Sequence, residues 1–124
     1  MTEIRLLVSG SRDGYDPDRF ALELGIEIGH LTRRLGDERP RLVLIHGNAK
    51  GVDQQAHALS SYFDQVIAMS ASWDAYGVSA GPRRNERMLK EGKPTHGLIF
   101  PGGRGTSDMM NRLFAARIPF RFVG

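Results

Sequence analysis

The chain of 124 residues is long enough to bury one core and too short for two, so we expect a single domain over residues 1–124. Apolar residues make up 40% and charged residues 25%, close to globular averages, and no apolar run approaches the length that crosses a membrane. The absence of cysteine excludes disulfides and cysteine metal sites. Together with a first segment that lacks a signal-peptide pattern, it predicts a cytoplasmic protein with no membrane partner.

The net charge of +3 comes with an uneven choice of basic residues, since 14 of the 17 are arginine. The planar guanidinium suits bidentate contacts with phosphate, although a GC-rich codon usage would explain the same excess. The sequence pI of about 9.7 meets the first criterion for a nucleic-acid binder. The basic residues form no long run, however, and nucleic acid is not the partner that we expect.

Short apolar runs alternate with stretches in which apolar residues recur at helical spacing. We expect strands at residues 4–8, 42–45, 66–69, 98–100 and 120–123. We expect helices at residues 17–35, 52–63, 82–91 and 106–117, with residues 70–81 irregular. This alternation predicts an α/β fold of three layers, in which helices cover both faces of a parallel sheet through right-handed crossovers.

The ends of two predicted helices carry specific signals. Asp16 and Pro17 match the N-cap and first position of the first helix, and Pro82 matches the opening of the third. Gly25 and Gly29 lie inside the first helix, where each costs about 1 kcal/mol against alanine. They would permit close packing against the sheet or a second subunit, so a homo-oligomer is one expectation.

Three glycine-rich loops each follow a predicted strand. They are residues 9–13, 47–53 and 101–106, and loops that follow parallel strands meet at one edge of the sheet, where ligands bind. Glycine lets backbone N–H groups approach a ligand, and a helix that starts at Thr106 would point its positive end at the same spot. A tight turn would need glycine for steric reasons alone. The three loops together favour a phosphate site.

Arg83 and Arg84 are expected in the first turn of the third helix. A bound anion there would offset their repulsion from the positive end of the helix dipole. The alternative is that both side chains simply reach solvent. With the loop residues and Arg87 they make up the candidate ligand-binding set: Ser9, Gly10, Ser11, Arg12, Gly47, Asn48, Lys50, Gly51, Asp53, Arg83, Arg84, Arg87, Gly102, Gly103, Arg104, Gly105 and Thr106.

Some residues allow two interpretations. Asp53 could cap a helix or contact a ribose hydroxyl. Trp73 and Tyr76 could stack on a base or anchor their segment to the core. His57 follows Asp53 by four residues and shares its helical face, but no third ligand has suitable spacing, so neither a metal nor another cofactor is expected.

The motifs together resemble the SLOG superfamily, a Rossmann-like group that includes Lonely Guy phosphoribohydrolases, molybdenum-cofactor carriers and DprA/Smf proteins. The chain is most similar to the YspA-type, cpYpsA-related branch. The resemblance rests on residues 8–12, 46–53, 73–74, 81–85 and 101–106. It implies a five-stranded parallel sheet of order 3-2-1-4-5, with the loops after the first and fourth strands side by side. It also implies binding of nucleotides or nucleotide derivatives such as AMP, ADP-ribose or NAD.

One position departs from the Lonely Guy pattern, which continues as Gly-Thr-x-x-Glu. Met109 stands where those enzymes carry their catalytic glutamate. Asp108 is one residue earlier, which rotates it by about 100° on a helix. Asp108 and Glu86 are therefore candidates for an acid or base in another geometry only.

Three functions follow from these observations. The leading hypothesis is a sensor or processor that binds a nucleotide derivative through the glycine-rich loops. The second is cleavage of a nucleoside 5′-monophosphate into base and ribose phosphate, by resemblance to Lonely Guy enzymes. The third is single-stranded DNA binding of the DprA/Smf type, which the basic pI favours and the missing basic groove with interleaved aromatics does not.

Overall fold

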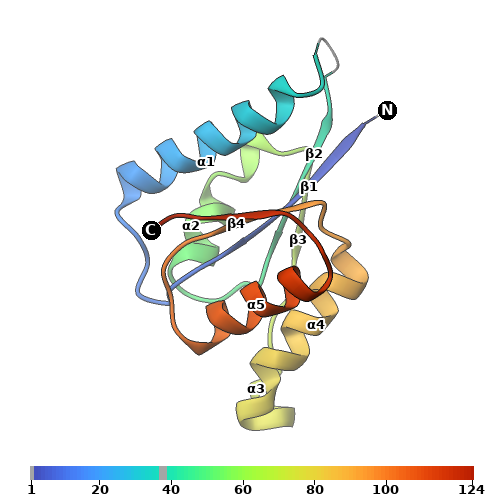
Figure 1. Ribbon diagram of the computed structural model, residues 1–124. Helices are drawn as coiled ribbons and strands as arrows, with labels where there is room; N and C mark the ends of the chain where they lie inside the picture. Colours follow the sequence, from blue (N-terminus) through green and yellow to red (C-terminus); the bar gives the residue numbers. More distant parts are fainter. Residues whose placement is uncertain (1, 37–38) are drawn as a thin grey trace.

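The computed structural model describes residues 2–36 and 39–124 and contains an all-parallel five-stranded sheet (Figure 1). The sheet order is β3-β2-β1-β4-β5, as the resemblance implied. The strands are β1 (Glu3–Ser9), β2 (Arg41–His46), β3 (Gln65–Ala68), β4 (His96–Ile99) and β5 (Phe120–Phe122). β1 is central and pairs with both β2 and β4, so the loop after β1 lies between the loops that follow its two neighbours.

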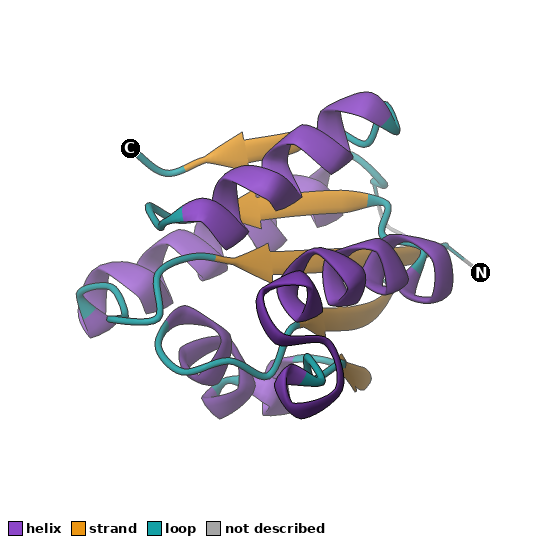
Figure 2. Cartoon of the chain, turned by 90° about the horizontal axis from the view of Figure 1, so that it is seen from below, coloured by secondary structure: helices purple, strands orange, loops and turns teal. Residues whose placement is uncertain are grey.

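Helices cover both faces of the sheet, and the strand arrows point the same way (Figure 2). The helices are α1 (Pro17–Arg33), α2 (Val52–Ala58), α3 (Trp73–Tyr76), α4 (Ala80–Gly92) and α5 (Arg104–Ala115), with 3-10 turns η1 (Ser60–Tyr62) and η2 (Gly77–Ser79). Among the described residues, no helix has the length and apolar character needed to cross a membrane. The predicted three-layer α/β architecture is confirmed.

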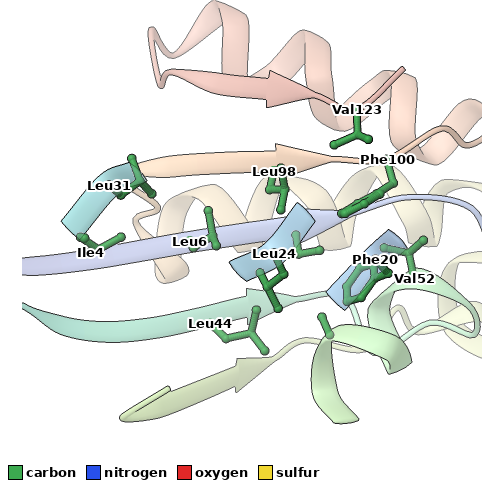
Figure 3. Close-up of a cluster of buried hydrophobic side chains, with 12 residues drawn as sticks. Ile4, Leu6, Phe20, Leu24, Leu31, Leu44, Val52, Leu98, Phe100 and Val123 are labelled. Atoms are coloured by element: carbon green, nitrogen blue, oxygen red, sulfur yellow. The ribbon is translucent and has the colours of Figure 1, made fainter. Parts of the chain in front are cut away.

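Alternate side chains of the strands enter two separate cores, as the period of an extended strand requires. On one face, Leu6 and Leu98 pack with Phe20 and Leu24 of α1 (Figure 3). On the other face, residues of β1, β2 and β4 pack with α4 and α5; the buried members are Leu7, Val43, Ile45, Met88, Ile99, Met109 and Leu113. Both helical layers are thus fixed to the sheet by fully buried apolar side chains.

Several helix boundaries differ from the sequence-based expectation. The helix predicted to reach residue 63 ends at Ala58, because Leu59 leaves the α-helical conformation (φ −101°, ψ 19°) and the 3-10 turn η1 follows before Phe63 becomes extended. The segment predicted to be irregular contains α3 and η2, and α4 begins at Ala80 rather than Pro82. Pro82 is tolerated there because the first-turn N–H groups have no intrahelical acceptor. The last helix, α5, begins at Arg104, two residues before the predicted start at Thr106, and its N-cap is Gly103.

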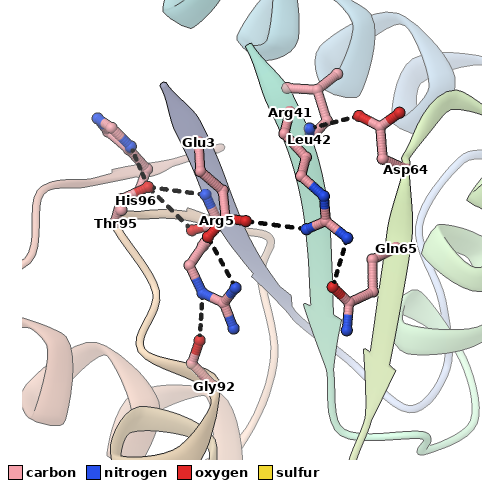
Figure 4. A network of polar contacts seen from close by, with 9 residues as sticks. All are labelled: Glu3, Arg5, Arg41, Leu42, Asp64, Gln65, Gly92, Thr95 and His96. Carbon is pink, nitrogen blue, oxygen red and sulfur yellow. Dashed lines mark hydrogen bonds and ion pairs between the residues drawn. The ribbon is translucent and has the colours of Figure 1, made fainter. Parts of the chain in front are cut away.

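A polar network closes the amino-terminal end of the sheet, away from the glycine-rich loops (Figure 4). Glu3 accepts hydrogen bonds from Arg5 at 3.0 Å and from Arg41 at 2.9 Å. Arg5 also donates to the carbonyl of Gly92 at 2.7 Å, and Arg41 donates to Gln65 at 2.9 Å. These arginines bridge neighbouring elements, so part of the arginine excess serves the fold rather than a ligand.

The entry to α2 requires glycine. Gly51 has φ 76° and ψ −126°, and a Cβ there would lie 2.5 Å from the carbonyl carbon of Arg12. Gly77 has nearly the same backbone, with φ 58° and ψ −131°, but nothing lies within 4 Å of an added Cβ. A substitution at Gly77 therefore adds backbone strain alone, whereas a substitution at Gly51 adds both backbone strain and a collision with the β1 loop.

We expect Gly51→Ala to lower the free energy of unfolding more than Gly77→Ala does. Both substitutions strain the backbone, by about 1–3 kcal/mol each, and Gly51→Ala also pushes the α2 loop off the β1 loop. Urea unfolding monitored by circular dichroism measures the difference, which we expect to be about 2 kcal/mol. Equal losses for the two variants would show that the loops do not touch as described.

Candidate ligand-binding site

A cavity of about 570 Å³ opens at the carboxyl edge of the sheet, where the loops after β1, β2 and β4 meet. Most of the predicted ligand-binding residues line it: Ser9, Gly10, Ser11, Arg12, Gly47, Asn48, Lys50, Asp53, Arg84, Gly103, Arg104, Gly105 and Thr106. The lining also includes Trp73 and Asp13, Ala49 and Gly81, which lie in the predicted motifs but were not chosen as ligand-binding residues, and Ser70 and Ala71, which the sequence reasoning missed. The predicted convergence of the three loops is therefore present in the structure.

The amino end of α5 supplies backbone donors to this cavity. Gly103 is the N-cap residue and has no side chain to accept a hydrogen bond from the first turn. Arg104, Gly105 and Thr106 follow it in the helix and line the cavity. First-turn N–H groups have no intrahelical acceptor, and the helix dipole adds about half a positive charge at this end. An anion in the cavity would satisfy these donors.

The amide of Ser11, predicted to bind phosphate, is already used within the protein. It donates to the carbonyl of Pro101 at 2.9 Å, which joins the β1 loop to the β4 loop. The Ser11 carbonyl accepts from Val52 N–H at 3.0 Å, and its hydroxyl accepts from Asp13 N–H at 2.9 Å. Ser11 lines the cavity, but its main chain fixes the loops instead of contacting a ligand.

Asp53 organises the loop that precedes α2. Its carboxylate accepts from the Ala49 N–H at 3.1 Å, and the side chain is only 6% exposed. Burial raises the pKa of this carboxyl, while the hydrogen bonds from the Ala49 and Gly47 amides and the charge of Arg84 act to lower it. The N-cap of α2 is Gly51, so Asp53 holds the loop rather than capping the helix.

Asn48 fixes the same loop from the opposite side. It has φ 55°, a left-handed conformation that asparagine tolerates better than most residues. Its side chain donates to the Ser70 hydroxyl and accepts from Gln54, both at 2.9 Å. The loop is thus attached to the segment after β3 and to α2.

His46 ends β2 directly under this loop and is fully buried. Its Nδ1 accepts from the Asn48 N–H at 2.9 Å, so a neutral ring carries its proton on Nε2, which lies 2.9 Å from His57 Nδ1. Burial, the neighbouring His57 and the charge of Arg84 lower the pKa of His46 to about 4. His57 thus contacts His46, and in the described part of the chain no three side chains of His, Cys, Asp or Glu converge in a way that could hold a metal ion.

Arg84 reaches the cavity from α4, with two of its nitrogens held in place. Nη1 donates to the Gly47 carbonyl and Nε donates to Asn85 Oδ1 at 3.0 Å. Asn85 is buried and in turn donates to the Gly105 carbonyl at 3.1 Å and to Asp108 at 3.0 Å. Burial lowers the pKa of Arg84, although the nearby Asp53 charge raises it. Asn85, which the sequence reasoning did not include among the ligand-binding residues, orients Arg84 against the amino end of α5.

The other helix-borne candidates lie outside the cavity lining. Arg83 stacks on the Tyr76 ring at 4.3 Å, and Arg87 pairs with Glu91 at 2.9 Å. Glu86 pairs with Lys90 at 3.3 Å, and Asp108 is held by Arg112 at 2.8 Å.

The remaining predicted residues also differ from the expectation. Gly51 and Gly102 shape the loops without lining the cavity. Because α4 begins at Ala80, Arg84 is in its second turn, and the predicted pair of first-turn arginines is wrong.

Comparisons with family models, with curated proteins and with solved structures found no match. The arguments on function therefore rest on the geometry and the charges of this site and on the sequence motifs described above.

The low pKa of His46 makes stability depend on pH in a specific direction. The unfolded chain takes up a proton near pH 6.5, the ordinary pKa of histidine, whereas the folded protein resists protonation until about pH 4. The stability loss is therefore absent above the unfolded pKa and grows as pH falls between these values. Between about pH 7.5 and about pH 5, we expect His46 alone to lower the free energy of unfolding by about 2 kcal/mol.

We expect His46→Gln to remove that part of the pH dependence, because glutamine can replace both hydrogen bonds without titrating. Urea unfolding of the parent and the variant at the two pH values measures the difference. His30→Gln, which removes an exposed histidine of α1, is the control and should leave the parental pH dependence unchanged. A His46→Gln variant with the same pH dependence as the parent would contradict the assignment.

Proposed function

We propose that the cavity binds the phosphate of a nucleotide or nucleotide derivative, such as AMP, ADP-ribose or NAD, and that the protein acts as a sensor or processor of that ligand. The observation that carries the proposal is the first turn of α5, whose donors line the same cavity as a group of cationic side chains. A cavity of about 570 Å³ is of the size that holds a small molecule. The resemblance to the SLOG superfamily points to the same class of ligand.

The charges around the cavity suit an anion. Four cationic side chains line it, against two carboxylates; the cations are Arg12, Lys50, Arg84 and Arg104. In the described chain, no carboxylate lies within ion-pair distance of any of the four. Each charge-assisted hydrogen bond to a phosphate oxygen contributes about 1.5–3 kcal/mol. Two or three such bonds contribute about 3–9 kcal/mol, whereas a micromolar complex needs about 8 kcal/mol, so contacts with the rest of the ligand must add to them.

The hydrogen bonds of Arg84 leave one nitrogen of its guanidinium available to bind a ligand. Nε and Nη1 are used by Asn85 and Gly47, and Nη2 has no acceptor among residues 2–36 and 39–124. Because the other two nitrogens are fixed, little rotamer entropy is lost when Nη2 binds a phosphate oxygen. Arg84 is therefore the preorganised cation of the proposed site, and the exposed Arg12 and Arg104 are the adaptable ones.

Binding is better supported than cleavage of the N-glycosidic bond. Glu86 and Asp108, the two carboxylates considered for that reaction, are ion-paired and absent from the cavity lining. Met109 is fully buried in the core against the sheet. A general acid or base must come within hydrogen-bond reach of the substrate, and neither candidate is placed for that.

Thermal unfolding with AMP, ADP-ribose, NAD and cyclic AMP tests the proposal. A ligand at 100 times its dissociation constant stabilises the fold by about 2.7 kcal/mol, which raises Tm by several degrees for a chain of this size. We expect Arg104→Gln to weaken binding about tenfold or more, because it removes a cation at the amino end of α5. Isothermal titration calorimetry measures that loss.

Arg87→Gln is the matched control. It removes the same charge from the chain, but Arg87 is paired with Glu91 and lies outside the cavity lining. We expect the Arg87→Gln variant to bind like the parent. If all four compounds leave Tm unchanged, or if both arginine variants lose affinity equally, the proposed site is wrong.

A further inference from the structure

Trp73 is placed in a way that packing does not explain. It begins α3, lines the cavity and is 46% exposed, whereas Phe20 and Phe100 in the core are at most 1% exposed. An aromatic residue that anchors a segment to the core is largely buried. Trp73 instead offers part of its indole ring to a cavity that is also lined by four cationic side chains. The rest of this inference depends on the proposed phosphate site.

The position of the indole ring is fixed at one edge. A Cβ on Gly81, in the first turn of α4, would lie 3.4 Å from Trp73 Cη2, so the ring edge packs close to the α4 backbone. The Arg12 guanidinium lies over the ring, 5.3 Å from its centroid. Two stacked planes in contact are separated by about 3.5–4.0 Å, so Arg12 is not in full contact with the ring. A planar group between them would need about 7 Å, which the exposed Arg12 side chain can provide by a small shift.

We propose that Trp73 is the platform for an aromatic base, so that the ligand is a nucleoside phosphate and not a sugar phosphate or inorganic phosphate. The phosphate lies at the amino end of α5, and the base stacks on Trp73 with the Arg12 guanidinium on its other face. Guanidinium groups stack on aromatic planes and keep their charge for the phosphate side of the cavity. One end of the cavity is thus selective for the base and the other for the phosphate.

Tyr76 is the natural comparison on the same short helix. Its ring is already covered by the Arg83 guanidinium at 4.3 Å, and it is not among the residues that line the cavity. Tyr76 and Trp73 are similarly exposed, at 50% and 46%. A substitution at Tyr76 therefore changes the exposed aromatic surface of α3 and leaves the proposed platform intact.

The test compares ligands that share a phosphate and differ in the base. AMP is titrated against ribose 5-phosphate, and ADP against ribose 5-diphosphate, by calorimetry. We expect each nucleotide to bind roughly 5- to 100-fold more tightly than its partner without a base, the range that stacking of one base gives. Trp73 is the only tryptophan of the chain, so its fluorescence reports directly on the platform. AMP should quench it, and ribose 5-phosphate at saturation should not.

Substitutions then separate stacking from folding. Trp73→Leu should bring the affinity for AMP down to that for ribose 5-phosphate, while ribose 5-phosphate binds as to the parent. Trp73→Phe keeps an aromatic face and should retain most of the preference for AMP. Tyr76→Leu should leave both affinities unchanged. Unaltered binding of ribose 5-phosphate shows that each variant is folded.

The outcomes distinguish this inference from the proposed function. If ribose 5-phosphate binds as tightly as AMP, or if Trp73→Leu weakens both by the same factor, the base platform is wrong and the phosphate site stands. If Trp73→Leu leaves the preference for AMP intact, the base binds elsewhere and the inference is again overturned. If none of these compounds binds and ADP-ribose, NAD and cyclic AMP also leave Tm unchanged, the proposed phosphate site fails, and the platform fails with it.

Discussion

Two backbone hydrogen bonds of Ser11 hold the candidate site together. Its N–H donates to Pro101 after β4, and its carbonyl accepts from Val52 after β2. Because β1 is the central strand, a single residue at its end can reach the loops on both sides. Gly10 next to it has no room for a Cβ, which would lie 2.7 Å from Val52 Cγ2 and 2.9 Å from Phe100 Cβ. The three loops form one surface because their backbones touch, and side chains then decide what that surface binds.

A second set of interactions holds the cation of Arg84 in the cavity without neutralising it. The chain Arg84–Asn85–Asp108–Arg112 connects α4 to α5 through hydrogen bonds of 2.8–3.0 Å. Asp108 pairs with Arg112 rather than with Arg84, and it does not line the cavity. Asp53 is near enough to influence Arg84 electrostatically but uses its oxygens on loop amides. Partial burial without an ion pair keeps a guanidinium oriented and still able to bind an anion.

The fold and most of the site follow from sequence patterns whose physical basis is local. Apolar runs separated by helical periods predicted the layers, and glycines after strands predicted the loops. Helix starts were less predictable. Proline and glycine are tolerated at several positions of a first turn, so the starts expected at Pro82 and Thr106 lie two residues after the observed ones. Arg83 and Arg84 could not be distinguished, since a difference of about 100° on the helix sends one to Tyr76 and the other to Gly47. The use of the Ser11 amide and the role of Asn85 depend on contacts between segments far apart in the chain, which no local pattern records.

The two ends of the sheet use their arginines differently, which explains why the arginine excess alone could not indicate a ligand site. At the amino end, Arg5 and Arg41 share Glu3, and beside β5 Arg121 pairs with Glu23 and Glu27, so charge there is balanced. At the carboxyl end, four cations and two carboxylates line one cavity; burial and the Arg12 charge lower the pKa of Arg84, and the Asp53 charge raises it. Repulsion among these cations opposes folding, and the phosphate that we propose to bind there would reduce it. Stability and the proposed binding would then be coupled through the same side chains, so an unpaired cation at this edge is a better guide to function than the arginine count of the whole chain.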